Sequence, residues 1–401
     1  MRRIAEWLMF GFAAMYAVGK GLRVWLELTV GLPQGFDYEI TTWLIDYRGG
    51  FVRRGLVGEG LWWLKECLGI DPLFVIVPVA IGLYLALAAF LLLAFRRRGW
   101  IWWIVPTTLL LGGVDVLRTD GLVLCLVVGI VASATRIKQA WLRLLAVNVI
   151  AVLGVLVHEV VFFMTVPMLV WLELGDDELP MPKAVRPIVL APVVLALSFA
   201  TMCSGDAVVR DVIVSGWHDS LGDWWSAARY LGVSVGLTPA DVIGANVAHL
   251  TTTYLGVPAW VFVPIGVVFA GAFICVTVGS LRVMGLLALQ FVSLVPVFVC
   301  LCDPSRALCF WLFGSLMWML FVEWDRLPLA GCVRTEVPML MRRVVLAVSL
   351  VIGVPYVGYS PLVAVGQSPI GTWLTFAFGK VLVEKGYLLT PGYPMIEAWA
   401  R

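Results

Sequence analysis

Residues 142–174 read LRLLAVNVIAVLGVLVHEVVFFMTVPMLVWLEL, and this long, mainly apolar run decides how the chain is arranged. As one straight helix it would span roughly 50 Å at about 1.5 Å per residue, whereas the hydrocarbon core of a bilayer is about 30 Å thick. We therefore predict two short helices, 142–157 and 160–174, that meet at His158 and Glu159.

The rest of the chain has the same apolar character. Of its 401 residues, 61% are hydrophobic and 13% are charged, whereas a soluble domain carries about 25% charged residues. The apolar residues come in continuous blocks, which indicates spanning helices rather than the alternating strands of a membrane barrel. The sequence therefore predicts an all-α, polytopic transmembrane helical bundle of about ten or eleven spanning helices. It is expected to form a single domain, 1–401.

Basic residues orient this bundle, because cytoplasmic loops are enriched in Lys and Arg. Two crossings within 142–174 keep Arg334, Arg342 and Arg343 on the same side as Arg96–Arg98, whereas one crossing would separate them. The N-terminus is then cytoplasmic, and the first apolar run is expected to be a retained helix. The expected spans are 5–29, 72–95, 99–114, 121–135, 142–157, 160–174, 187–203, 257–280, 284–301, 308–322 and 343–360.

Three long segments are then expected outside the cytoplasm. They are the first outer loop 30–71, the long outer loop 204–256 and the outer C-terminal tail 361–401. The long outer loop is expected to contain interfacial helices, because Trp and Tyr concentrate at the headgroups. The expected location is the inner (plasma) membrane of a bacterium.

The first outer loop is rich in arginine, on the side where arginine is depleted. Asp46, Arg48, Arg53 and Arg54 lie close together, accompanied by Gly49, Gly50 and Gly55. Guanidinium groups match phosphate oxygens, and glycines allow close backbone approach and amide donation to an anion. We interpret this loop as a binding site for a phosphorylated headgroup. The alternative is arginines that reach ordinary phospholipid phosphates beside an amphipathic helix.

His158 and Glu159 are the second candidate, because ionisable residues deep in an apolar run are functional candidates by default. His can act as acid or base near neutral pH, with Glu orienting it. The alternative is a hydrogen-bonded pair that fixes helix packing. The zinc-protease motif His-Glu-x-x-His is absent, because Phe162 stands where the second histidine would be.

Further charged residues are expected on the extracytoplasmic side. Asp115, Arg118 and Asp120 occupy a short outer turn and suggest a water-filled cavity, although an ordinary solvated loop would also explain them. His218 lies in the long outer loop. Arg306 stands near the start of an expected helix, where a local capping arrangement is the alternative interpretation.

Several function classes are not supported. The net charge of +2 is too small to indicate a nucleic-acid partner. No phosphate-binding loop, dinucleotide fingerprint or Gly-x-Ser-x-Gly motif is present. The eight cysteines form no Cys-x-x-Cys pair and are interpreted as packing residues. We therefore predict no cofactor and no metal site.

The layout of residues 1–175 resembles the GT-C class of membrane glycosyltransferases, and more loosely the bacterial polysaccharide polymerases of the O-antigen type. The matching features are a cytoplasmic N-terminus, an acidic first outer loop (Asp46) that continues into an amphipathic stretch (56–68), and a second outer turn, Leu117-Arg118-Thr119-Asp120-Gly121-Leu122. The resemblance implies sugar transfer from a polyprenyl phosphate or pyrophosphate carrier outside the cytoplasm. It also implies that Asp46 is a base or positions the acceptor.

The resemblance further implies that Arg48, Arg53, Arg54 and Arg118 hold the lipid phosphates. The chain departs from the class because Asp46 has no adjacent carboxylate, which gives no support to a metal, and because no large soluble C-terminal domain follows. A polymerase therefore fits better than the larger transferases. The expected partners are a polyprenyl-phosphate-linked glycan and membrane lipids.

The charged motifs and the resemblance together give the following residue roles. The expected catalytic residues are Asp46, Asp120, His158 and Glu159, and the expected substrate-binding residues are Arg48, Arg53, Arg54, Asp115, Arg118, His218 and Arg306. Two alternative functions stay open. One is a membrane acyltransferase that modifies envelope glycans with His158 as base, and the other is a transporter or flippase of an anionic lipid.

Overall fold

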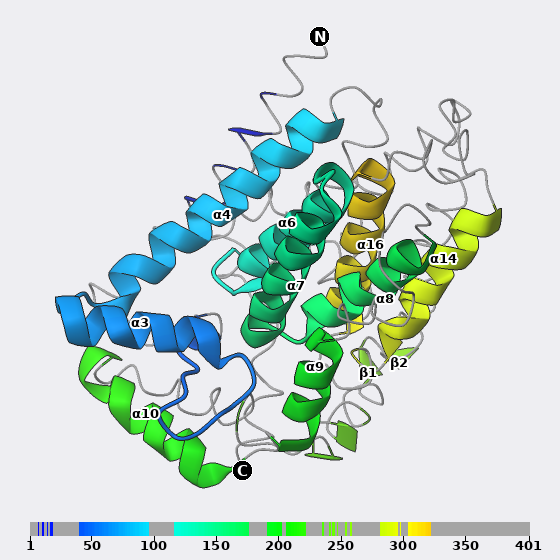
Figure 1. The fold of residues 1–401 in the computed structure, drawn as a ribbon. Helices are drawn as coiled ribbons and strands as arrows, with labels where there is room; N and C mark the ends of the chain where they lie inside the picture. Colours follow the sequence, from blue (N-terminus) through cyan, green and yellow to red (C-terminus); the bar gives the residue numbers. More distant parts are fainter. Residues whose placement is uncertain are drawn as a thin grey trace.

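The computed structural model describes residues 40–95, 116–175, 191–202, 206–221, 253–254, 257–258, 281–295 and 304–321, together with isolated positions between and before them. This part of the chain is helical apart from one short hairpin (Figure 1). Its helices are α3 (Gly55–Leu68), α4 (Pro72–Phe95), α6 (Asp120–Arg136), α7 (Ala140–Val157), α8 (Val160–Gly175), α9 (Ala191–Met202), α10 (Ala207–Leu221), α14 (Leu281–Ser293) and α16 (Pro304–Phe321).

Two of these helices are long and apolar enough to cross a membrane, judged by length and composition. They are Pro72–Leu93 within α4 and Ala140–Val157, which is α7. Shorter apolar helical stretches lie in α8 and α16. The expected spans 99–114 and 343–360, the tail 361–401 and all but isolated positions of 5–29 lie outside the described residues.

The predicted break at His158 and Glu159 is confirmed. Helix α7 ends at Val157, His158 has extended backbone with φ −165°, and α8 begins at Val160. A Cβ at Gly154 would lie 2.6 Å from Cγ1 of Val161, so the chain can fold back tightly here only because position 154 has no side chain.

Two clusters of buried apolar side chains organise the described part. The larger one joins α4, α6, α7, α8, α14 and α16, with Tyr84, Phe310 and Trp318 fully enclosed. The smaller one lies under residues 40–52 and joins them to α3, α4 and α10. Figure 1 shows α3 crossing the end of α4 where α4 begins, with α10 beside it. The segments expected outside the membrane thus share a small core of their own.

Two expected spans were wrong in their bounds. Val257 and Pro258 form strand β2 (Val257–Pro258), which pairs antiparallel with β1 (Thr253–Tyr254), so no helix starts at residue 257. Helix α14 covers Leu281–Ser293 rather than 284–301. The backbone leaves the helical conformation at Leu294, and Val295 and Val297 are helical again.

Candidate functional site

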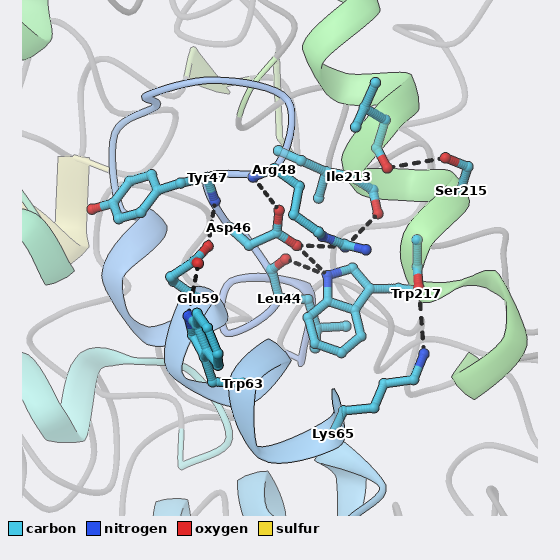
Figure 2. A network of polar contacts seen from close by, with 12 residues as sticks. Leu44, Asp46, Tyr47, Arg48, Glu59, Trp63, Lys65, Ile213, Ser215 and Trp217 are labelled. Atoms are coloured by element: carbon cyan, nitrogen blue, oxygen red, sulfur yellow. Dashed lines mark hydrogen bonds and ion pairs between the residues drawn. The ribbon is translucent and has the colours of Figure 1, made fainter. Parts of the chain in front are cut away.

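Asp46 anchors the first outer loop and is completely enclosed. Its exposed fraction is 0%. Its Oδ1 accepts a hydrogen bond from the backbone amide of Arg48 at 3.0 Å, and its Oδ2 accepts from Nη2 of Arg48 at 2.6 Å and from Nε1 of Trp217 at 2.8 Å (Figure 2). The carboxylate expected to act on substrate is therefore occupied by protein donors, and it holds Arg48 in place.

The guanidinium of Arg48 is held on several sides by α3 and α10. Its central carbon lies 3.5 Å from the ring centre of Trp62 and 5.1 Å from that of Trp217. Nη2 also donates to the carbonyl of Ile213 at 3.3 Å. A Cβ at Gly216 would overlap the guanidinium, so a side chain there would displace the end of Arg48. Arg48 therefore joins α10 to the first outer loop through cation–π and hydrogen-bond contacts.

Arg54 joins the first outer loop to the break between α7 and α8. Its Nε donates to Oε2 of Glu159 at 2.9 Å, and its Nη2 donates to Oε1 in a parallel, very short contact. The two residues are separated by 105 positions in the chain. This bidentate pair brings together the two strongest candidates from the sequence, the arginine-rich loop and the His-Glu pair.

The charge state of Glu159 follows from its neighbours. Burial would raise the pKa of this carboxyl, but the electrostatic interactions with Arg54, His158 and Arg53 and the hydrogen bond from Arg54 outweigh burial and hold the pKa well below its usual range. Glu159 is therefore an anion at neutral pH. Arg53, which is half-buried, belongs to the same electrostatic cluster.

His158 is almost fully enclosed beside Glu159, with an exposed fraction of 1%. Its Nδ1 accepts a hydrogen bond from the amide of Val160 at 3.2 Å and lies 3.4 Å from Oε2 of Glu159, and its ring packs against Phe310. One ring nitrogen cannot accept from the amide and donate to the carboxylate at once. Protonation of His158 at Nδ1 would therefore exchange the first contact for the second.

The turn before α6 is buried rather than solvated. Arg118 and Asp120 have exposed fractions of 9% and 0%, which argues against an ordinary solvated loop. Nε1 of Trp43 donates to the carbonyl of Leu117 at 2.6 Å and so ties this turn to the first outer loop. A Cβ at Gly121 would meet α4 at ordinary contact distance.

The structure does not bring every candidate together. His218 is exposed on α10, next in sequence to the enclosed Trp217. Arg306 lies in the first turn of α16, whose first residue, Pro304, suits a position with no helical hydrogen-bond partner. Asp115 lies outside the described residues.

The glycines of the first outer loop serve packing within the protein. A Cβ at Gly49 would lie 2.8 Å from the carbonyl oxygen of Val209 on α10, and one at Gly55 would overlap the ring of Tyr47. The amide of Gly50 donates to the carbonyl of Tyr47 at 3.0 Å. The expected close approach of backbone is present, but its partner is the protein, and the Gly50 amide is not available to an anion.

Three residues that support the loop were missed by sequence reasoning. Trp217 holds Asp46, Trp62 lies under Arg48, and Glu59 accepts hydrogen bonds from the amide of Tyr47 at 3.1 Å and from Nε1 of Trp63 at 3.2 Å. The only local signal was aromatic residues on two amphipathic stretches, which equally indicates helices at a membrane interface.

Within the described residues, no group of three or more His, Cys, Asp or Glu side chains is placed to hold a metal ion. No protein-family model, no curated protein and no solved structure matches this chain. The functional argument therefore depends on the site itself.

Proposed function

We propose that this chain is a polytopic membrane glycosyltransferase or polysaccharide polymerase. It would transfer sugar from a polyprenyl phosphate or pyrophosphate carrier at the extracytoplasmic face of a bacterial inner membrane. The observation that carries the proposal is the bidentate contact between Arg54 and Glu159, since it unites arginines with an acid–base pair at one helix break. The apolar helices α4 and α7 support the membrane setting.

The outward surface of α7 also supports this setting. Four of its exposed apolar side chains recur every fourth residue, at Trp141, Leu145, Val149 and Leu153, and the exposed Leu142 lies next to the first of them. Residues four apart lie on one face of a helix, so this stripe matches contact with lipid chains.

The proposed chemistry needs cations that stabilise the leaving phosphate and a base that accepts a proton, and the site contains candidates for both. As the bond between the anomeric carbon and the carrier phosphate breaks, its electron pair and negative charge pass to the phosphate oxygen. Arg53 and Arg54 would stabilise that charge. The acceptor hydroxyl oxygen attacks the anomeric carbon, and Glu159, which is partly exposed and lies beside His158, would receive the hydroxyl proton.

Asp46 has a different part in this proposal from the one expected from the sequence. Because its oxygens accept hydrogen bonds from Arg48 and Trp217, it acts through Arg48 instead of on substrate. The polyprenyl chain of the carrier is apolar and would lie in the lipid, alongside the apolar helices.

The test is a glycolipid profile of a strain that lacks the protein. We expect intact lipid-linked precursor to accumulate and the finished envelope glycan to be lost. A copy of the gene with Ser215→Ala, an exposed position on α10, should restore the envelope glycan in this strain. Copies with Glu159→Gln or His158→Ala should not. If deletion leaves both the lipid-linked intermediates and the envelope glycans unchanged, the proposal is wrong.

An acyltransferase is the second candidate, favoured by the enclosed imidazole of His158 next to a carboxylate. In that case deletion would leave glycan chain length normal and would remove acyl groups from the glycan. Mass spectrometry of the envelope glycan distinguishes the two activities.

A further inference from the structure

We propose that Trp217 is a positioning residue for the arginine loop, defined as residues 46–54, and that α10 holds this loop in the geometry that presents Arg53 and Arg54. This inference rests on the proposed function. Trp217 has an exposed fraction of 0%, so it would act through its neighbours rather than on substrate.

The indole of Trp217 secures the first residue of the loop. Its Nε1 is 2.8 Å from the carbonyl oxygen of Leu44 and 2.8 Å from Oδ2 of Asp46, so one N–H group is shared between backbone and carboxylate. Its ring meets Trp62 edge to face at 5.5 Å. A phenylalanine could keep most of the apolar contact but neither polar one.

The neighbouring residue on α10 completes the attachment. Gly216 lies against the guanidinium of Arg48, and its carbonyl accepts a hydrogen bond from Nζ of Lys65 at 3.4 Å. Both cations also lie over the ring of Trp62. One turn of α10 therefore contacts the loop, Asp46 and α3 together, as Figure 2 shows.

A short and well-supported path leads from Asp46 to the arginines. The amide of Tyr47 donates to Glu59, the amide of Gly50 donates back to Tyr47, and the Tyr47 ring covers Gly55. Arg54, directly before Gly55, then reaches Glu159. A loop supported at both ends and across its middle has little freedom, so a shift at Asp46 would move Arg53 and Arg54 relative to Glu159.

The first measurement is the opening of α10, which needs no enzymatic activity. Cysteine is introduced at Ile213, which is fully enclosed, or at Val212, which has an exposed fraction of 40%, in a background in which all eight native cysteines are replaced by serine. In Trp217→Phe, we expect maleimide labelling at position 213 to be roughly tenfold faster, the factor that loss of about one buried hydrogen bond predicts. Labelling at position 212 should be unchanged.

Gly216→Ala is the second variant, because it displaces Arg48 while leaving the indole intact. Ser215→Ala is the matched control on the same turn, since its hydroxyl donates only within α10, to the carbonyl of Val212. The proposal is overturned if the labelling rate at position 213 is the same as in the wild type both in Trp217→Phe and in Gly216→Ala.

The second measurement is turnover of a polyprenyl-pyrophosphate-linked oligosaccharide by the full-length protein in detergent. We expect both variants to raise KM about tenfold with a smaller change in kcat, because the loop that binds phosphate is displaced while His158 stays in place. Faster labelling with unchanged kinetics would show a merely structural role and overturn the inference. Failure of the proposed function is separate, since it would appear as an unchanged glycolipid profile on deletion.

Discussion

At Arg54, a strained backbone and an ion pair occur in the same residue. It is the one non-glycine residue in the described part with positive φ, at 66°, and it stands directly before α3. A non-glycine side chain in this region costs about 1 kcal/mol or more. The contact with Glu159 offsets that cost and holds the loop in its present shape.

Two substitutions at this position separate strain from the ion pair. Arg54→Gly and Arg54→Ala both lose the contact with Glu159, for which about 1.5–3 kcal/mol is typical. Glycine also relieves the strain, so we expect Arg54→Gly to be more stable than Arg54→Ala by about 1 kcal/mol. Denaturation of the purified protein in detergent measures the difference. Equal stabilities would show that the backbone here is unstrained.

The depressed pKa of Glu159 predicts how stability depends on pH. A carboxyl whose pKa is lower in the folded state stabilises that state fully above the unfolded value, about 4.3 for Glu. That contribution is lost as the pH falls through the range between the unfolded and folded pKa values. The stability advantage of wild type over Glu159→Gln should therefore shrink as the pH is lowered from about 6 to below about 4. An advantage that does not vary with pH would contradict this.

Helix α8 contains a proline whose structural effect is compensated by a neighbouring helix. Pro167 lies inside α8 and leaves the carbonyl of Phe163 without its helical N–H donor. The hydroxyl of Ser293 on α14 lies 3.1 Å from this carbonyl oxygen and 2.7 Å from that of Gln290, so its one hydrogen is shared between the two acceptors, and Nε2 of Gln290 donates to the next carbonyl, at Met164, at 2.7 Å. Side chains of α14 thus contact the carbonyls of an interrupted helix, as the proposed membrane setting would require.

This arrangement predicts a strong coupling between α8 and α14. Ser293→Ala should cost about 1 kcal/mol in the wild type, because the Phe163 carbonyl loses its donor. In a Pro167→Ala background the restored backbone amide would replace that donor, so the same substitution should cost much less. A double-mutant cycle measured by detergent denaturation gives the coupling. Additive effects would show that the hydroxyl does not substitute for the missing amide.

At the scale of the whole molecule, the described segments that are predicted to lie outside the cytoplasm gather at one end of the helices. Figure 1 shows α3 and α10 together where α4 begins. The exposed Phe51 and Val208 belong to this end, whereas the exposed Lys138 lies between α6 and α7, on the side predicted to be cytoplasmic.

Labelling from outside the cell tests this sidedness. In spheroplasts of a variant in which all eight native cysteines are replaced by serine, cysteines introduced one at a time at positions 51 and 208 should react with a membrane-impermeant maleimide. A cysteine at Lys138 should react only after permeabilisation. Reaction of all three positions, or of none, before permeabilisation would exclude the proposed topology.

Local features of the chain were sufficient to predict most helices in the described part. Continuous apolar blocks located α4, α6, α7 and α8 to within about two residues at each end, an error typical of helix boundaries. The break at His158 followed from the length of the apolar run, which is too great for one helix in a bilayer, from the polar pair within it, and from the placement of later arginines. The hairpin at Thr253–Pro258 was missed because its short strands lie beside a long apolar run that suggested a helix.

The contacts that define the site were beyond local sequence features. Apolar blocks and the distribution of basic residues predicted that residues 46–54, 158–159 and 204–256 lie on one side of a membrane, but not that Arg54 pairs with Glu159 or that Trp217 encloses Asp46. Hydrophobic pattern and turn residues act over a few positions along the chain. Contacts between distant segments depend instead on how the helices pack together, and only that packing places Asp46 in a supporting role and Arg54 beside the acid–base pair.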